Sequence, residues 1–120
     1  MNPFGIQEKS FRLLTEAFAR FPEVEEVLVF GSRAKGNYKT GSDIDLAIKG
    51  AKCNHKTAID IAGYLNEEIP IPYYIDVIYY EGLKNQDLKA HINRVGEPLF
   101  RLDADSAPPL SSSNRQSPLP

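Results

Sequence analysis

The sequence predicts an α/β (α+β) protein in which helices pack on a small mixed β-sheet. Segments with a helical spacing of apolar residues alternate with short segments rich in β-branched and aromatic residues. Proline and glycine separate these segments, for example at Pro22, Gly36 and Pro70. The chain has 120 residues, of which 42% are apolar and 25% charged, and this suffices for one domain with its own core.

Three long helices are expected, over residues 3–20, 55–68 and 83–95. In each, apolar side chains recur every three or four residues, which places them on one face. The first helix shows this spacing in Phe11, Leu14, Phe18 and Phe21. Asn2 is a suitable cap for its start. A short helical turn is also expected over residues 32–35, because Gly36 breaks it.

Strands are expected over residues 26–30, 43–49, 74–80 and 99–102. The first three are rich in Val, Ile, Leu and aromatic residues, a composition that favours half-buried sheets. In the second and third, apolar side chains alternate with others, so each strand has one core-facing side.

Composition argues against several classes of protein. The net charge of -2 and the pI of about 5.7 make nucleic acid a poor candidate for a partner. Cys53 is the only cysteine, so we expect neither an intramolecular disulfide nor a thiolate zinc cluster, and a reduced, cytoplasmic setting fits best. No apolar run approaches the roughly 20 residues of a membrane-spanning helix, so we expect no membrane association.

The chain is expected to contain a single folded domain, residues 1–102. From residue 103 the composition changes, and the stretch up to residue 120 is rich in Pro and Ser. Such a stretch has little to bury, so we expect a disordered tail.

The most informative segment covers residues 31–50, GSRAKGNYKTGSDIDLAIKG. Gly31 follows an apolar strand and lets the backbone turn sharply and approach a ligand. Ser32 opens a helical turn, where free N–H groups favour an anion, and its hydroxyl can donate to a phosphate oxygen. Arg33 and Lys35 add positive charge nearby. The segment therefore predicts a phosphate-binding turn.

Three aspartates are candidates for a metal site. Asp43 and Asp45 are two residues apart on an expected strand, so their side chains point to one face about 7 Å apart. Two such carboxylates repel each other unless a cation lies between them, and oxygen ligands suit Mg²⁺. Asp76 lies inside another apolar strand, where an unpaired charge is costly. If the two strands are neighbours, the three carboxylates can hold two metal ions about 3.5–4 Å apart.

A Gly-Ser pair, ten further residues and Asp-Ile-Asp resemble the signature of the DNA polymerase β nucleotidyltransferase superfamily. In this sequence the pattern covers Gly31, Ser32, Asp43, Ile44 and Asp45. Its full spelling, GSRAKGNYKTGSDIDL, resembles the minimal nucleotidyltransferases (MNT), antitoxins that are partners of HEPN-domain toxins. The resemblance covers residues 6–100 and implies a nucleotidyltransferase fold.

The resemblance also implies roles for the matched residues. Gly31 and Ser32 would hold the triphosphate of ATP, and Arg33, Lys35 and Ser42 of the loop are further candidates for nucleotide binding. Asp43 and Asp45 would bind two Mg²⁺ ions, for which Mn²⁺ is an alternative. Asp76, the third carboxylate of the family, would bind the catalytic metal and help to deprotonate the attacking hydroxyl.

The implied reaction transfers AMP from ATP to a hydroxyl of a partner HEPN toxin, a tyrosine, and so neutralises the toxin. Because the chain is too short to carry an acceptor-binding domain, we expect another chain to present the acceptor, in a hetero- or homo-oligomer. Two alternatives stay open: an antitoxin that blocks its partner by contact alone, and nucleotidyl transfer to a small molecule.

Each feature also has an ordinary structural interpretation. A Gly-Ser pair often marks only a strand-to-helix turn, and a lone aspartate can be solvated or paired with a Lys or Arg. His55 and His91 each stand alone on an expected helix without a second ligand at metal spacing, so we interpret both as surface or helix-end residues. The joint pattern, on the expected elements, carries the nucleotidyltransferase hypothesis.

Overall fold

The computed structural model describes residues 2–102, so the predicted disordered tail lies outside the described residues. The elements in chain order are α1 (Glu8–Phe18), β1 (Glu26–Phe30), α2 (Gly31–Lys35), β2 (Ile44–Lys49), α3 (His55–Glu67), β3 (Ile75–Tyr79), the 3₁₀ helix η1 (Tyr80–Gly82), α4 (Gln86–Val95) and β4 (Glu97–Arg101). Within this part of the chain, no helix combines the length and the apolar composition needed to cross a membrane.

The four strands form one mixed sheet in the order β3-β2-β1-β4, which confirms the predicted fold class. β1 pairs antiparallel with both β2 and β4, whereas β2 and β3 are parallel. A parallel pair needs a long crossover connection, and α3 supplies it. The two strands that carry the predicted carboxylates are therefore direct neighbours.

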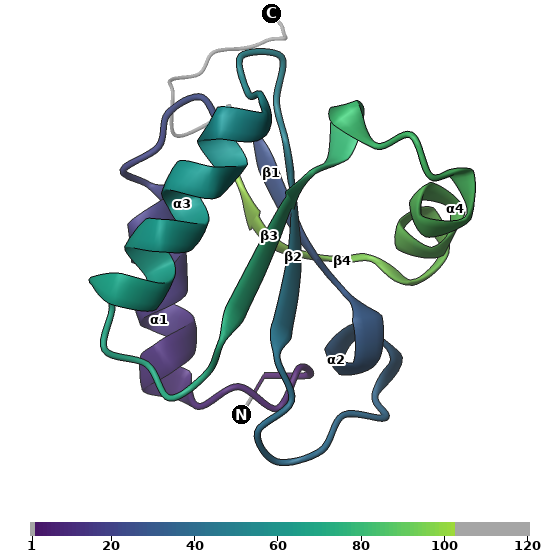
Figure 1. Cartoon of the computed structure of the whole chain (residues 1–120). Coiled ribbons are helices and arrows are strands. Elements are labelled where there is room, and N and C mark those ends of the chain that lie inside the picture. Colours follow the sequence, from purple (N-terminus) through teal and green to yellow (C-terminus); the bar gives the residue numbers. More distant parts are fainter. Residues whose placement is uncertain (1, 103–120) are drawn as a thin grey trace, which may run out of the picture.

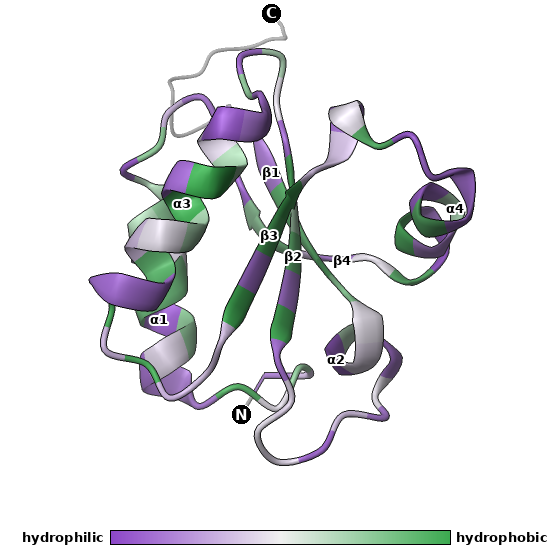
Figure 2. Cartoon of the chain, in the orientation of Figure 1, coloured by the Kyte–Doolittle hydropathy of each residue, from purple (hydrophilic) through white to green (hydrophobic). Residues whose placement is uncertain are grey.

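The helices cover the two faces of the sheet unequally (Figure 1). We call the face under α1 and α3 the closed face, and the face partly covered by α4 the open face. The larger hydrophobic core lies on the closed face, and its most buried large side chains include Leu14, Phe18, Ile44, Leu46, Ile48, Ile61, Leu65 and Ile75. Figure 2 shows hydrophobic residues along the strands and on the helix sides that face them.

The open face has a smaller cluster. Its fully enclosed members are Phe30, Ala47 and Ile92, with half-buried side chains from α4 and the strands around them. Along β1, β2 and β3 the side chains alternate between the two faces, as expected. Only part of the open face is therefore closed by packing.

The first helix begins at Glu8, so the prediction of a start near residue 3 was wrong. Asn2 does not cap the helix; its side-chain oxygen accepts hydrogen bonds from the backbone N–H groups of Phe4 and Ile6. Gly5 adopts a φ of 67°, which a helix does not allow. This turn places Phe4 and Ile6 in the hydrophobic core. The burial of these two side chains therefore outweighs the tendency of the segment to continue the helix.

The last helix also starts later than predicted. Residues Tyr80–Gly82 form a 3₁₀ turn, and α4 begins at Gln86. The side chain of Asn85 accepts a hydrogen bond from the N–H of Leu88 and so caps α4. The apolar spacing identified the helix but could not locate this cap.

Candidate active site

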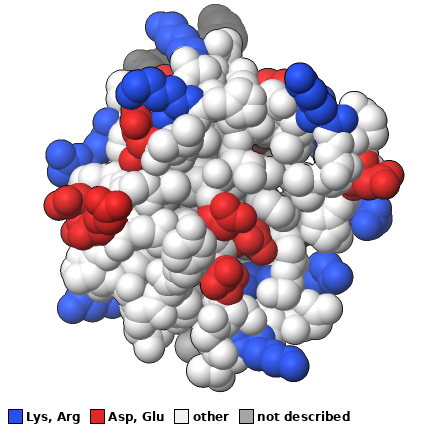
Figure 3. Space-filling model, viewed as in Figure 1, with Lys and Arg blue, Asp and Glu red and all other residues white. Residues whose placement is uncertain are grey.

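Asp45 and Asp76 stand opposite each other on β2 and β3. They are direct register partners in the parallel pair, and Phe30 of β1 is opposite Asp45 on its other side. The next row of the sheet holds Ala47 and Ile78, both part of the open-face cluster, so the carboxylates share that face. Figure 3 shows acidic atoms near the middle of the surface, where β2 and β3 run. The predicted convergence of the two strands is therefore present.

The electrostatics of Asp45 reflect its neighbours. Burial raises the pKa of the Asp45 carboxyl, and the charges of Asp76 and Asp43 raise this pKa further. Asp45 is half-buried, whereas Asp43, just before β2, and Asp76 are exposed. Asp43 and Asp76 thus both lie close enough to repel the Asp45 carboxylate, and a cation would relieve that repulsion.

The donor set fits a hard divalent cation, since carboxylate oxygens are the ligands that Mg²⁺ and Mn²⁺ prefer. Within residues 2–102, no group of three or more His, Cys, Asp or Glu side chains is already arranged to hold a metal ion. Mg²⁺ commonly binds through one or two carboxylates, with water and substrate phosphates completing its shell. An open set of carboxylates suits that mode of binding.

The turn after β1 brings the backbone directly against this acidic row. Gly31 has a φ of 72°, and a Cβ there would overlap the Asp45 carboxylate. Only glycine combines that backbone conformation with so close an approach. Ser32 and Lys35 lie on α2, Ser32 half-buried and Lys35 exposed, and Gly36 with a φ of 85° ends the helix. The expected turn is present, and it borders the carboxylates.

Arg33 lies in a different environment from that expected for a phosphate ligand. Its side chain is 2% exposed. The guanidinium donates hydrogen bonds to the carbonyl oxygens of Phe4, Gly5 and Ser42. The hydroxyl of Ser42 accepts a hydrogen bond from the N–H of Lys39 and thereby holds the loop. The guanidinium of Arg33 is thus used internally, so a phosphate contact does not suit its placement.

His91 borders the site, which sequence reasoning missed. Its Nε2 accepts a hydrogen bond from the N–H of Gly31 at 3.3 Å, and its ring packs edge-on against Phe30. A signal was available, because His91 follows Leu88 by three residues and precedes Val95 by four, and both of these pack on the sheet. Helical spacing therefore places His91 on the inner side of α4.

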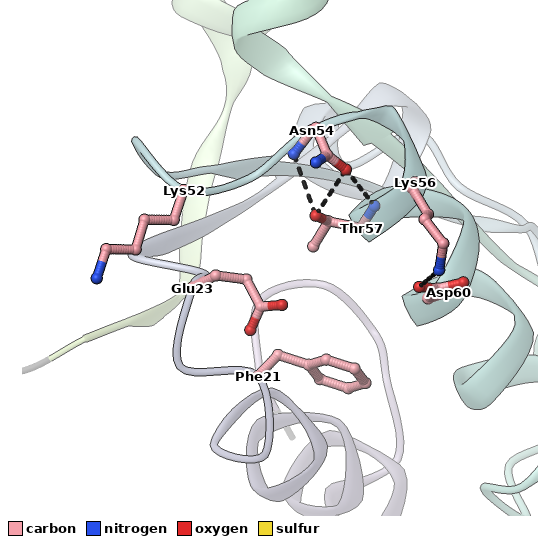
Figure 4. A pocket seen from close by; sticks show the side chains of 7 residues that line it. All are labelled: Phe21, Glu23, Lys52, Asn54, Lys56, Thr57 and Asp60. Carbon is pink, nitrogen blue, oxygen red and sulfur yellow. Dashed lines mark hydrogen bonds and ion pairs between the residues drawn. The ribbon is translucent and has the colours of Figure 1, made fainter.

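A pocket of about 250 Å³ lies beyond the end of β2 that is remote from Asp45 (Figure 4). Four of its polar side chains are paired with one another: Asn54 and Thr57 form a reciprocal cap at the start of α3, and Lys56 pairs with Asp60 at 2.8 Å. No predicted site residue lines it, so it is not the candidate active site.

The fold is that of the nucleotidyltransferases. A family model described as "Polymerase beta, Nucleotidyltransferase" matches residues 13–105, most of the chain. The chain belongs to this family. A search of curated proteins gave no match.

Several solved structures share this fold. One is a toxin–antitoxin with AMP-PNP, at a TM-score of 0.63 and 18% identity over 79% of this chain and 76% of the other. Another is a tri-AMPylated Shewanella oneidensis HEPN toxin in complex with MNT antitoxin, at 0.59 and 16% over 84% and 77%. A third is a putative nucleotidyltransferase from Sulfolobus solfataricus, at 0.50 and 23% over 77% of each chain. At these identities the likeness shows the fold.

Proposed function

We propose that this chain transfers AMP from ATP to a tyrosine hydroxyl of a HEPN-domain toxin and thereby acts as its antitoxin. The observation that carries the proposal is the pairing of Asp45 with Asp76, in register on parallel strands and bordered by the Gly31 turn. In this arrangement a triphosphate and a divalent cation can meet next to a carboxylate that accepts a proton.

Each residue of the site has a distinct role in this reaction. Asp43, Asp45 and Asp76 would hold divalent cations, Mg²⁺ or Mn²⁺, whose positive charge would stabilise the triphosphate and the charge that develops during transfer. Gly31 lets the backbone of the turn approach the phosphate oxygens, Ser32 binds them through its N–H and hydroxyl, and the exposed Lys35 adds positive charge. The acceptor oxygen bonds to the α-phosphorus, the bond from this phosphorus to pyrophosphate breaks, and the hydroxyl proton passes to Asp76.

The choice of partner is supported by similarity of fold. Two structures with this fold are described as toxin–antitoxin complexes, one with AMP-PNP and one with a tri-AMPylated HEPN toxin. The described residues of this chain form one sheet with its covering helices, so an acceptor must come from outside this unit. A partner protein that presents a tyrosine meets that need.

The test is intact-mass spectrometry of a HEPN-domain candidate partner, incubated with this protein, ATP and Mg²⁺. We expect the partner to gain the mass of one or more AMP groups. The Asp43→Asn, Asp45→Asn double variant should give no added mass. Asp60→Asn is the matched control, because Asp60 is an exposed aspartate on α3 outside the site, and its surface ion pair contributes little.

Each outcome distinguishes among the hypotheses. Added mass that depends on Asp43 and Asp45 supports AMP transfer. A stable, neutralised complex without added mass would favour an antitoxin that acts by contact. Label transferred from ATP to a small acceptor, with the partner unmodified, would favour the small-molecule reaction.

A further inference from the structure

Arg33 is the most enclosed charged residue described, and two aromatic rings enclose it. Its guanidinium carbon lies 4.9 Å from the ring centre of Tyr38 and 4.9 Å from that of Tyr73. Cations over aromatic faces are attracted by the ring quadrupole, more strongly when water is excluded. The guanidinium also donates four hydrogen bonds to carbonyl oxygens. Burying a charged group costs free energy, and these contacts offset that cost.

The groups held by Arg33 come from three separate segments around the site. Phe4 and Gly5 belong to the N-terminal turn, Tyr38 and Ser42 to the loop after α2, and Tyr73 to the approach to β3. Arg33 itself lies on α2, two residues after Gly31. One side chain therefore connects α2 to three other segments of the chain.

The contact with Ser42 has the most direct link to the chemistry. Both Nε and Nη2 of Arg33 donate to the Ser42 carbonyl, at 3.2 and 2.9 Å. That carbonyl belongs to the peptide bond that leads to Asp43, an exposed residue outside the strand. After Asp43, the N–H of Ile44 is held by the carbonyl of Tyr74. The backbone of Asp43 is thus held on both sides, by Arg33 and by Tyr74, the residue just before β3.

We propose that Arg33 is a positioning residue of the metal site: clamped between Tyr38 and Tyr73, it fixes the backbone at Asp43 and so sets where that carboxylate meets the cation. The inference rests on the proposed metal-binding role of Asp43. It replaces the phosphate contact expected for Arg33 with a supporting role. Groups that orient ligands in this way typically affect metal affinity or activity by about 10–100-fold.

The chain offers matched variants for a test. Arg33→Lys keeps the charge but loses the planar fork that grips the Ser42 carbonyl twice. Arg20→Lys is its control, because Arg20 stacks on a single ring, Tyr64, away from the site. Tyr38→Leu removes one ring of the clamp, and Tyr38→Phe keeps that ring.

The experiment measures binding of Mn²⁺ alone, followed by the electron paramagnetic resonance signal of the free ion. Near-ultraviolet circular dichroism confirms that each variant is folded. We expect the Mn²⁺ dissociation constant to rise about tenfold in Arg33→Lys, and by a smaller factor in Tyr38→Leu. Arg20→Lys and Tyr38→Phe should stay within about twofold of the wild type. In AMP transfer, a raised Mn²⁺ requirement should accompany the loss in rate.

The inference is overturned if folded Arg33→Lys and Tyr38→Leu bind Mn²⁺ as the wild type does, or if the wild type does not bind it. If Arg33→Lys does not fold, the comparison of Tyr38→Leu with Tyr38→Phe decides. Wild-type protein that binds Mn²⁺ but transfers no AMP would contradict the proposed function and leave the role of Arg33 intact.

Discussion

The two faces of the sheet differ in how completely they are covered. On the closed face, α1 and α3 bury a continuous core in which Ile44, Leu46 and Ile48 have no exposed surface. On the open face, α4 covers one region and leaves Asp43 and Asp76 exposed. Along β2, neighbouring residues belong to opposite faces, so the strand that holds the core together also presents the carboxylate of Asp45.

The contrast indicates that the closed face stabilises the fold and the open face carries the chemistry. Burial of apolar surface stabilises the fold through the closed face. On the open face, carboxylates that repel one another are kept together, which costs stability and produces a site for a cation. The variants below test this division, from the largest expected effect to the smallest.

The largest effect should come from Asp76→Asn on the open face. Removing this carboxylate removes both a metal ligand and the proton acceptor, so kcat/KM for AMP transfer should fall about 10³-fold, or about 4 kcal/mol of barrier. The melting temperature should not fall, since Asp76 is exposed. Steady-state kinetics and thermal unfolding check the two expectations, and a large loss of stability would contradict the division of the faces.

Leu46→Ala on the closed face should instead lower the stability of the fold. Leu46 has no exposed surface, so we expect a loss of about 2–5 kcal/mol in the free energy of unfolding. The matched variant Leu28→Ala, at a half-buried position of the open-face cluster, should lose less. Urea unfolding measures both changes. Equal losses would mean that the two faces stabilise the fold equally.

Gly31→Ala should lower both the stability of the fold and the affinity for Mn²⁺. A left-handed backbone costs a non-glycine residue about 1–2 kcal/mol, and the new Cβ would also displace the Asp45 carboxylate. We expect a stability loss of that size together with weaker Mn²⁺ binding. Gly63→Ala in α3, where a Cβ meets no neighbour, is the control and should change Mn²⁺ binding little. Unchanged Mn²⁺ binding by Gly31→Ala would show that the turn does not border the metal site.

The smallest effect should be a gain in stability from Asp45→Asn in the metal-free protein. The folded pKa of Asp45 is raised above 3.8, so its ionised form lowers stability progressively as pH rises from 3.8 through the folded pKa. The variant should therefore melt a few degrees above the wild type at pH 7 and show a smaller difference near pH 4. Mn²⁺ should raise the wild-type melting temperature and reverse the difference. Thermal scans at both pH values with and without Mn²⁺ provide the check.

Local pattern was sufficient for much of the fold and for part of the site. The β-branched run at Glu26–Phe30 predicted β1 to the residue, and Gly36 marked the end of α2. The alternation of side chains along residues 44–49 was predictable in the same way, although Asp43, which was expected inside this strand, lies just before it. These features depend only on residues close together in the chain, so periodicity and turn chemistry reveal them.

Three features were decided by the tertiary structure. The register of β2 with β3 places Asp76 beside Asp45, although 31 positions separate them in the sequence. Burial of Phe4 and Ile6 delayed the start of α1. Arg33, whose charge suggested a phosphate contact, is enclosed by residues from distant segments.

The sequence by itself therefore determined which elements form, and it predicted the nucleotidyltransferase chemistry through the Gly-Ser turn and the aspartates. Only the tertiary structure decided how those residues meet and which charged groups remain available. The physical reason is that propensity, capping and alternation act over a few residues, whereas strand register and the enclosure of a charge depend on contacts between segments far apart in the chain.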